Sequence, residues 1–497
     1  MRDGTDIQMP LWLTKRAALT PERTALASGG GNMTWEDLES QAKVTARRLA
    51  KLGIGEGDRV ALLMQNGPDM AVVIHALPFL GAVFVPINSR LVPSEIRWQL
   101  ADAGAKLLLY DLPHRETAET AAETEVLSWD RLASLKPAEG PLRSHLHLGE
   151  LHTIMYTSGT TGRPKGVMLS YGNHWWSATS SVFNLGLDMN DRWLVCTPFF
   201  HMSGLSILMR SVLYGITAVI HPSFDPAAAN RAIREDGVTI ISVVSTMLAQ
   251  MVEEQGGRGY PDHFRCMLLG GGPVPKPLLE RCRDQGIPVF QTYGLTETAS
   301  QIVTLAPEDS LRKLGSAGKP LFPSELRIMD GEEEASPGQP GEIVVRGPNV
   351  TLGYWKRSDV TREVLRDGWF RTGDIGCVDR EGFLFVLDRR SDLIISGGEN
   401  VYPAEVEAAL LAHPVVVEAG VTGVADKRWG AVPVGFVRVK PGEVVTEKEL
   451  VRFCGERLAR YKIPRRIHFV RELPKNASNK LVRRRLPELL EEKEEKR

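Results

Sequence analysis

The chain has 497 residues, of which 43% are hydrophobic and 24% are charged, and its formal net charge is −1 at pH 7. This length is too great for one hydrophobic core and predicts several domains, while the balanced charge gives no electrostatic reason to expect nucleic acid or an anionic membrane as a partner. The five cysteines are scattered without a CxxC pair, which argues against a disulfide framework or a zinc site.

No segment has the pattern of a signal peptide or a membrane helix. The first residues lack an apolar stretch. The longest apolar run, 71–87, is interrupted by His75, Pro78, Gly81 and Pro86 and is too short to span a membrane. Together with the scattered cysteines, these features predict a soluble protein of the cytoplasm.

The first hundred residues alternate between helical and extended patterns. Thr34-Trp-Glu-Asp37 resembles a capping box and starts a helix that ends at Gly53. The segments that follow are predicted as strand 59–64, helix 68–80, strand 82–87, helix 93–103 and strand 105–110. This alternation predicts parallel βαβ packing with helices on both faces of a sheet. From 111 to about 150 the pattern fades, and we expect a surface segment without chemistry.

The stretch Tyr156–Gly166 reads YTSGTTGRPKG and combines hydroxyl side chains, glycines and a lysine. Glycines let the backbone turn its N–H groups toward an anion, and Lys165 adds a positive charge. A Walker A loop is excluded because Pro164 precedes the lysine and Gly166 follows it. A surface hairpin rich in small residues is the plainer alternative. We favour a phosphate-binding loop made by Thr157, Ser158, Gly159, Thr160, Thr161, Gly162 and Lys165.

Three later turns follow predicted strands in the same way. Strand 193–197 leads to a turn that ends at His201, strand 238–244 leads to Ser245 and Thr246, and strand 266–269 leads to Gly270-Gly-Gly-Pro273. Open α/β sheets bind ligands at the carboxyl ends of their strands. A lone histidine is usually structural, but this position favours a functional role.

A second compact motif, Thr292-Tyr-Gly-Leu-Thr-Glu-Thr298, follows the predicted strand 289–291. Tyr293 offers a ring for stacking, Thr296 a phosphate donor, and Glu297 an oxygen ligand suited to Mg²⁺ that phosphate oxygens also hold. A core tyrosine, a helix N-cap and a solvated glutamate are the structural alternatives. Their grouping after a strand favours the functional interpretation.

The last third of the chain divides into two patterns. Between 315 and 387, short strands at 325–329, 342–346 and 383–387 alternate with Gly/Pro turns and predict a small barrel-like subdomain. Beyond a polar connector at 387–392, the sequence predicts an α+β module with strands 393–396, 415–421 and 432–440 and helices 403–411 and 447–458.

The two motifs at 156–166 and 292–298 resemble the signatures of the adenylate-forming superfamily, which contains acyl-CoA synthetases, beetle luciferases and the adenylation domains of peptide synthetases. The resemblance implies an α/β fold: a large N-terminal lobe of stacked βαβ sheets with a β-barrel-like subdomain (1–387), a hinge (388–391) and a small mobile α+β C-terminal domain (392–497). It also implies a ligase that joins a carboxylic acid to CoA through an acyl-adenylate, with ATP and CoA as co-substrates and Mg²⁺ as cofactor. Homodimers or homotetramers are common among relatives.

The same resemblance assigns roles to individual residues. Adenine would lie on the glycine turn with Tyr293 stacked on it, and the ribose hydroxyls would bind Asp374 with Arg389 beside it. The full ATP set outside the loop is Gly271, Gly272, Pro273, Thr292, Tyr293, Gly294, Thr296, Asp374 and Arg389. Glu297 would hold the metal.

The C-terminal module would supply the chemistry of both steps. Lys480 is implied as the catalytic lysine, with Asn479 where relatives mostly have glycine; asparagine tolerates positive φ well enough for the turn to survive. Gly397 and Gly398 would serve the CoA step. Ser391 occupies the hinge position that is commonly Asp or Lys, so the usual hinge chemistry is absent.

The identity of the carboxylic acid substrate is indicated by four further segments, 172–176, 200–206, 300–305 and 316–322. They resemble one branch of the superfamily, whose members act on an aromatic diacid. Its second carboxylate would need donors. Candidate residues for the acid site are His201, Ser203, Ser245, Thr246 and Gly270, with Arg210 if its helix faces inward. The alternatives are another aryl- or fatty-acyl-CoA ligase, a stand-alone adenylation protein that loads a carrier domain, and a non-catalytic nucleotide sensor.

Overall fold

The computed structural model describes residues 7–121, 123–157, 164–271, 274, 276–388, 393–440, 442–474, 481 and 483–489. They form two units: Met1–Ser89, Leu100–Met155 and Gly166–Leu387 make the first, and Arg90–Gln99, Tyr156–Lys165 and Asp388–Arg497 make the second. Each unit has its own hydrophobic core.

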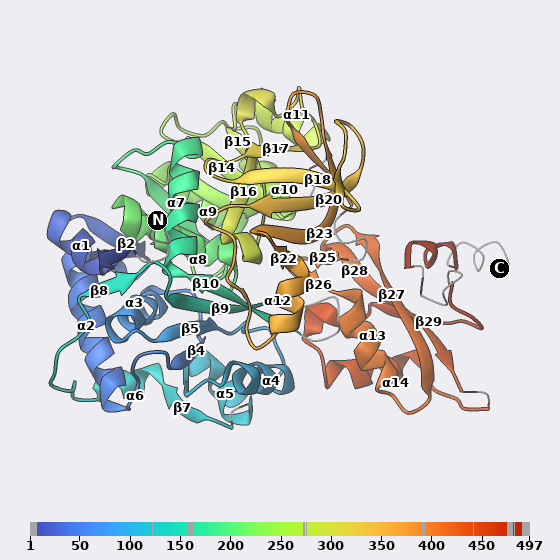
Figure 1. Ribbon diagram of the computed structural model, residues 1–497, viewed down its shortest axis with the longest axis horizontal. Coiled ribbons are helices and arrows are strands. Elements are labelled where there is room, and N and C mark those ends of the chain that lie inside the picture. The colour runs from blue at the N-terminus through green and yellow to red at the C-terminus, as the bar shows by residue number, and fades with distance from the viewer. Residues whose placement is uncertain are drawn as a thin grey trace. The chain divides into compact units, whose positions relative to one another are not determined.

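The predicted βαβ alternation near the N-terminus forms the parallel part of a mixed sheet, in which only the β10–β21 pair is shown to be antiparallel (Figure 1). Its strand order is β21-β10-β9-β5-β4-β6-β7. Helix α2 (Trp35–Lys51) begins with the capping box predicted at Thr34, whose side chain accepts a hydrogen bond from the Asp37 N–H. The predicted helix 68–80 is α-helical only over α3 (Pro68–Ala76) and continues as a 3₁₀ turn at Leu77–Leu80, because Pro78 has no N–H to donate. The other elements are β4 (Arg59–Leu63), β5 (Val83–Pro86), α4 (Pro93–Ala103), β6 (Leu107–Tyr110), β9 (Leu151–Thr157), β10 (Lys165–Ser170) and β21 (Gly353–Tyr354).

The expectation of a patternless segment at 111–150 is wrong. The segment contains α5 (Arg115–Ala121), β7 (Glu125–Ser128), α6 (Trp129–Ser134) and β8 (His145–His147). Strand β7 extends the sheet beside β6, but of its four residues only Leu127 is buried. A short edge strand with one buried side chain leaves too little periodicity to detect in the sequence.

A second sheet carries the other parallel strands, in the order β2-β12-β11-β13-β14-β15. One core cluster combines side chains from both sheets with side chains of α3, α7 and α8, so these helices lie between the sheets (Figure 1). A second cluster packs α9, α10 and α11 on the opposite face. The elements are β2 (Thr24–Ser28), α7 (Tyr171–Leu185), β11 (Arg192–Val195), α8 (Met202–Tyr214), β12 (Thr217–Ile220), α9 (Pro226–Glu235), β13 (Ile240–Val244), α10 (Ser245–Gln255), β14 (Cys266–Gly270), α11 (Lys276–Asp284) and β15 (Val289–Leu295).

The β-rich stretch does not form the predicted barrel. Its strands continue the second sheet as β16-β17-β24-β23-β20-β18-β19, and in the described residues this sheet stays open. A barrel closes only when its first and last strands pair, whereas here β17 joins β16 on one side and β24 on the other. The strands are β16 (Ser300–Leu305), β17 (Ser316–Pro320), β18 (Glu325–Asp330), β19 (Glu333–Glu334), β20 (Gly341–Arg346), β23 (Trp369–Val378) and β24 (Leu384–Asp388). A short strand, β22 (Leu365–Arg366), also pairs with β23.

Two candidate binding segments prove to be strand. Residues 292–295, predicted to follow a strand, belong to β15, and Asp374 lies inside β23. Both segments alternate buried and less buried side chains, and glycines within them hid the strand pattern.

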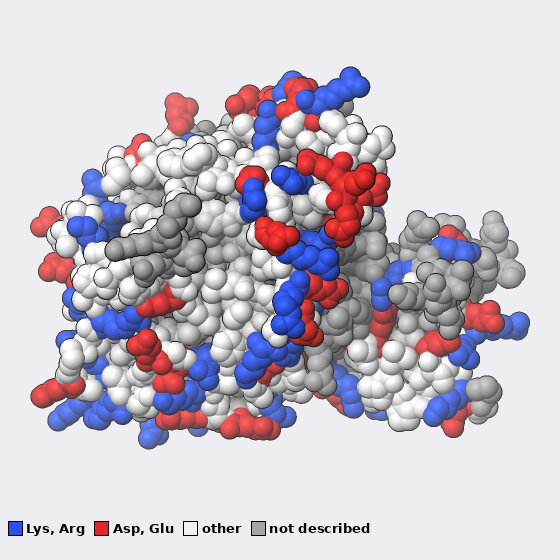
Figure 2. Space-filling view, viewed as in Figure 1, with Lys and Arg blue, Asp and Glu red and all other residues white. Residues whose placement is uncertain are grey.

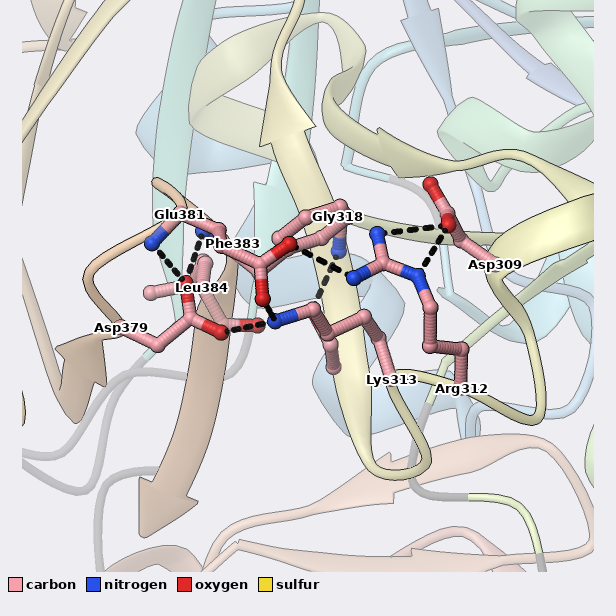
Figure 3. A network of polar contacts seen from close by, with 9 residues as sticks. Asp309, Arg312, Lys313, Gly318, Asp379, Glu381, Phe383 and Leu384 are labelled. Atoms are coloured by element: carbon pink, nitrogen blue, oxygen red, sulfur yellow. Dashed lines mark hydrogen bonds and ion pairs between the residues drawn. The ribbon is translucent and has the colours of Figure 1, made fainter.

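A network of charged side chains joins the loop before β17 to the turn between β23 and β24 (Figure 3). Lys313 Nζ lies 2.6 Å from Asp379 Oδ2 and also binds Glu381, while Arg312 binds Glu381 and Asp309 at 2.6 and 2.8 Å. The cations of Arg312 and Lys313 lie 5.2 and 4.7 Å from the centre of the Phe383 ring. The network therefore holds the start of β24 against the rest of the sheet.

The second unit is built on a sheet of order β26-β25-β28-β27, with β29 beside β28. Helices α13 and α14 contribute to one core cluster with these strands, as the predicted α+β module requires. The elements are β25 (Ile394–Ser396), β26 (Glu399–Val401), α13 (Pro403–Leu411), β27 (Val416–Asp426), β28 (Gly430–Val439), α14 (Glu447–Gly455) and β29 (Arg466–Phe469).

On the face drawn in Figure 2, basic and acidic side chains lie close to one another. In the part of the chain that the structure describes, no helix combines the length and the apolar character needed to cross a membrane.

Candidate active site

The sheet edge formed by the carboxyl ends of β11, β13, β14 and β15 collects most of the predicted residues of the first unit. These strands are parallel neighbours, and Val244 lies opposite Gly270 while Leu269 lies opposite Gln291. Because parallel strands end at the same edge, the structure brings together the turn before His201, the start of α10 at Ser245, and Gly270 at the end of β14. A Cβ added to Gly270 would lie 3.3 Å from Thr292 Cγ2, so this edge is close-packed.

The turn that presents His201 is fixed from two sides. Buried Asn66 donates from Nδ2 to the Thr197 carbonyl at 2.8 Å and accepts from the Phe199 N–H at 2.9 Å. Gly204 sits so close to the turn that a Cβ would lie 2.3 Å from the Pro198 carbonyl oxygen. His201 is the N-cap residue of α8 and its ring packs edge-on against Phe200 at 4.8 Å. The histidine is therefore held at the sheet edge by its backbone.

The residues predicted for the acid differ in exposure. Ser203 is exposed on the first turn of α8, and Ser245 and Thr246 are half-buried on the first turn of α10. Arg210 is only 1% exposed and its guanidinium lies 5.3 Å from the Trp193 ring. Its Nε and Nη2 have no hydrogen-bond partner among the described residues, and burial lowers the pKa of Arg210.

Two residues predicted for the nucleoside contact each other. The Tyr293 hydroxyl donates to Asp374 Oδ2 at 2.7 Å, and the two residues are 2% and 4% exposed. The Asp374 N–H donates to Thr372 Oγ1 at 3.0 Å. The tyrosine thus orients the carboxylate, while ring stacking and ribose binding stay predictions.

Glu297 lies on a strained 3₁₀ turn, Thr296–Thr298, between β15 and β16. Ala299 and Ser300, which follow it, have φ of 50° and 104°, values that cost free energy for residues other than glycine. Gly294 is required because a Cβ there would lie 1.9 Å from the Ser300 carbonyl oxygen. The turn is therefore held in place by its surroundings.

Three successive carbonyls of this turn each accept a hydrogen bond from another segment. The Glu297 carbonyl accepts from the Thr351 N–H at 2.8 Å and the Thr298 carbonyl from Asn349 Nδ2 at 2.9 Å. The Ala299 carbonyl accepts from Ser177 Oγ of α7 at 2.6 Å. These bonds offset the backbone strain and fix where the Glu297 side chain starts.

The Glu297 carboxylate suits a metal ion that phosphate oxygens also hold. The residue is 7% exposed, and its Oε1 accepts a hydrogen bond from the Tyr354 hydroxyl at 2.8 Å. Among the described residues no group of three or more His, Cys, Asp or Glu could hold a metal. Mg²⁺ bound to nucleotides needs only one or two protein carboxylates, so this donor set fits it.

Sequence reasoning missed the segment Asn349–Tyr354, which supplies three of these contacts. Its residues Asn349, Thr351 and Tyr354 are all 4% exposed or less. The segment is short and polar and looks like an ordinary loop. The only available signal was Gly-Tyr at its end, and no spacing rule connects that pair to Glu297.

The predicted phosphate loop is described only at its ends. Thr157 is the last residue of β9 and Lys165 the first of β10. The intervening Ser158, Gly159, Thr160, Thr161 and Gly162 lie outside the described residues. The same holds for Gly272, Pro273, Arg389, Ser391 and Lys480.

In the second unit, Gly397 and Gly398 form the turn between β25 and β26, with φ of 58° and 85°. The Gly397 N–H donates to the Trp429 carbonyl at 2.8 Å, and a Cβ on Gly397 would lie 2.6 Å from the Trp429 ring. Glycine is therefore needed at this turn for a structural reason, and its role toward CoA stays a prediction.

Comparison with known proteins decides the family. The model of the AMP-binding enzymes matches residues 13–355, and the model of the AMP-binding enzyme C-terminal domain matches residues 405–480. The chain belongs to the AMP-binding enzyme family. The family that the motifs at 156–166 and 292–298 indicated is thereby confirmed.

Within the AMP-binding family, similarity to individual proteins extends over nearly the whole chain. A 2-succinylbenzoate–CoA ligase of Geobacillus kaustophilus is 57% identical over 487 residues, which cover 98% of this chain and 99% of that protein. A double mutant of o-succinylbenzoate CoA synthetase (MenE) from Bacillus subtilis, bound with the product analogue OSB-NCoA, is 47% identical with a TM-score of 0.93 over 97% of this chain and 98% of that one. The B. subtilis enzyme in complex with the acyl-adenylate intermediate OSB-AMP gives 47% identity and a TM-score of 0.77 over the same shares.

Proposed function

We propose that the protein is a 2-succinylbenzoate–CoA ligase, an AMP-forming acid–thiol ligase of menaquinone (vitamin K2) biosynthesis. It converts 2-succinylbenzoate, ATP and CoA into 2-succinylbenzoyl-CoA, AMP and pyrophosphate. The observation that carries this proposal is 57% identity to a ligase of that name across 99% of its length. The B. subtilis synthetase has also been crystallised with ATP and magnesium ion, which supports the same nucleotide and metal here.

In the first step the chain's residues hold the triphosphate against the acid. Backbone N–H groups and hydroxyls between Thr157 and Lys165 bind phosphate oxygens, and the Lys165 ammonium adds charge. Glu297 holds Mg²⁺, which when bound neutralises charge on the phosphates. Lys480 bridges the attacking carboxylate and the α-phosphate, where negative charge grows in the transition state. Asp374, oriented by Tyr293, binds the ribose.

In the second step a thiol must reach the acyl-adenylate after Lys480 has withdrawn. We assign this exchange to a rotation of the C-terminal domain about 388–391, which brings the Gly397-Gly398 turn to the nucleotide in place of Lys480. Chemical cross-linking of the C-terminal domain in the orientation that places Lys480 at the nucleotide should permit acyl-adenylate formation and block thioester formation.

The test of the proposal is pyrophosphate release with a panel of acids, with and without CoA. We expect 2-succinylbenzoate to be preferred over benzoate and over medium-chain fatty acids, and CoA to be consumed. Preference for a fatty acid would identify a different ligase of the family. Failure to use free CoA would favour a protein that loads a carrier domain, and ATP binding without turnover would favour a nucleotide sensor.

Lys480→Ala tests the chemical assignment. We expect adenylation to slow by roughly 10²-fold or more with the fold intact, measured as pyrophosphate release. The matched control is Lys427→Ala, which removes an exposed lysine of the same domain and should leave the rate unchanged. Normal pyrophosphate release by Lys480→Ala would remove this lysine from the mechanism.

The second carboxylate of the acid is assigned to donors at the sheet edge. His201, Ser245 and Thr246 are at this edge and none is fully buried. Thr246→Val should lower kcat/KM for 2-succinylbenzoate more than for benzoate, because only the diacid loses a partner. Equal losses for both acids would place the second carboxylate elsewhere.

The remaining predictions concern the cell and the assembly. All five cysteines are described and are free thiols, which supports the proposed location in a reducing cytoplasm. A homo-oligomer and the lack of a nucleic-acid partner stay predictions.

A further inference from the structure

In the part of the chain that the structure describes, the buried hydroxyl of Tyr354 is the one side-chain donor to the carboxylate of the proposed metal ligand, Glu297. Its oxygen lies 2.8 Å from Glu297 Oε1, and the residues are 4% and 7% exposed. Among the described residues Glu297 forms no ion pair. One oxygen of the carboxylate is therefore tied to a neutral donor.

A neutral donor orients a carboxylate without competing for its charge. An Arg or Lys at this place would pair with Glu297 and reduce its attraction for a cation. A hydroxyl instead holds one oxygen and leaves the other for the metal. Removing a group that orients a metal ligand in this way typically costs about 10- to 100-fold in metal affinity or activity.

The position of Tyr354 is itself fixed by the strand that leaves the phosphate loop. Tyr354 lies opposite Val167 in the β10–β21 pair. The Trp355 N–H donates to the Gly166 carbonyl at 2.8 Å, and Thr351 Oγ1 donates to the Met168 carbonyl at 2.6 Å. The same short segment also binds the carbonyls of Glu297 and Thr298.

We propose that Tyr354 is a positioning residue for the metal site: it sets the Glu297 carboxylate in register with β10, the strand that pairs with its own strand β21. This inference rests on the proposed function, in which Glu297 holds Mg²⁺ on the nucleotide.

The experiment measures ATP affinity by calorimetry without acid, at low and saturating Mg²⁺. The ratio of the two affinities reports the coupling between metal and nucleotide. Tyr354→Phe removes only the hydroxyl, and we expect the ratio to fall about 10-fold or more. The matched control is Tyr260→Phe, which removes a hydroxyl that donates to Asn230 Oδ1 at 2.6 Å and should leave the ratio unchanged.

A second measurement separates positioning from loss of structure. Thioester formation from synthetic acyl-adenylate and CoA needs no ATP, so Tyr354→Phe should retain its rate within about twofold of the wild type on this account. Loss of both the metal coupling and this second half-reaction would mean that Tyr354 merely supports the fold, and would overturn the proposal.

A double-mutant cycle distinguishes this inference from the function on which it rests. Glu297→Gln should lower the Mg²⁺ ratio, and Tyr354→Phe added to it should cause no further loss, because the tyrosine acts only through the glutamate. An unchanged ratio in Glu297→Gln would refute the metal assignment. A lowered ratio in Glu297→Gln together with a normal ratio in Tyr354→Phe would refute the positioning role alone.

Discussion

Two polar networks in the first unit are built in opposite ways. Behind Glu297, neutral donors from Ser177, Asn349 and Tyr354 bind groups that are almost completely buried. Beside Phe383, Arg312 and Glu381 form ion pairs while about half exposed, at 50% and 54% (Figure 3). Water can replace a lost partner in the second network but not in the first. The buried neutral bonds should therefore matter more to stability than the more numerous charges.

The largest expected effect comes from buried groups that must stay neutral. His75, His152 and His174 are buried, with 5% exposure or less, and the ring centres of His152 and His174 lie 4.8 Å apart. Burial lowers the pKa of His75 to about 4, and burial with the nearby Arg210 charge lowers that of His174 to about 3. The unfolded chain takes up protons near pH 6.5, where the folded state does not, so stability is complete above that pH and is lost as the pH falls toward 4.

Urea unfolding at pH 7 and pH 5 measures this loss. Protonation of His75 in the unfolded chain should by itself reduce the free energy of unfolding by about 2 kcal/mol at pH 5. His75→Leu should therefore reduce the difference in the free energy of unfolding between pH 7 and pH 5. His145→Gln, at an exposed histidine, is the control. Equal stability of the wild type at both pH values would contradict the prediction.

The network beside Phe383 depends on pH over a different range. Hydrogen bonds from Lys313 and then Arg312 lower the pKa of Glu381, so the contribution of Glu381 to stability is lost only below the pH range in which a glutamate usually titrates.

The next largest effect is expected for Asn349→Ala. Asn349 is 0% exposed, donates to the Thr298 carbonyl and accepts from Ser324 Oγ at 3.0 Å. Removing it leaves buried groups without partners and should cost about 2 kcal/mol of stability, measured by urea unfolding at pH 7. Asn190→Ala, at an exposed position, should be near neutral. A cost no larger than that of the control would mean that the turn at Glu297 does not need this bond.

A smaller loss is expected for Ser177→Ala, because a single hydroxyl is removed from the Ala299 carbonyl. We expect about 1 kcal/mol. Ser134→Ala is a close control, since Ser134 Oγ also donates to a backbone carbonyl, that of Arg131, but at an exposed site. The two variants differ mainly in burial. Equal losses of stability would therefore contradict the claim that buried hydrogen bonds contribute more than exposed ones.

The smallest effect is expected for Arg312→Met. Arg312 and its partner Glu381 are 50% and 54% exposed, and the substitution removes the charge while it keeps a long apolar side chain. Any fall in Tm should be small at low salt and should vanish at high salt, where exposed charges are screened. A large loss that persists in salt would show that this network resembles the buried one.

An element could be predicted from the sequence when the residues that specify it lie close together in the chain. The helix cap at Thr34 and α4 were predicted because their signals lie within a few residues. The edge strand β7 was missed because one buried leucine carries no period, and β15 and β23 were shortened because glycines interrupt them. The barrel expectation failed because short strands look alike whether the sheet closes or stays open.

What the sequence determined by itself were the hydroxyl- and glycine-rich motifs and the family they signal, since their chemistry resides in consecutive residues. What only the tertiary structure decided were the partners of those motifs: Asn349 on Thr298, Tyr293 on Asp374 and Tyr354 on Glu297. Each of these bonds joins residues more than fifty positions apart. Such contacts form where strand register and a strained turn bring distant segments of the chain together. No pattern of neighbouring residues in the sequence indicates which segments will meet.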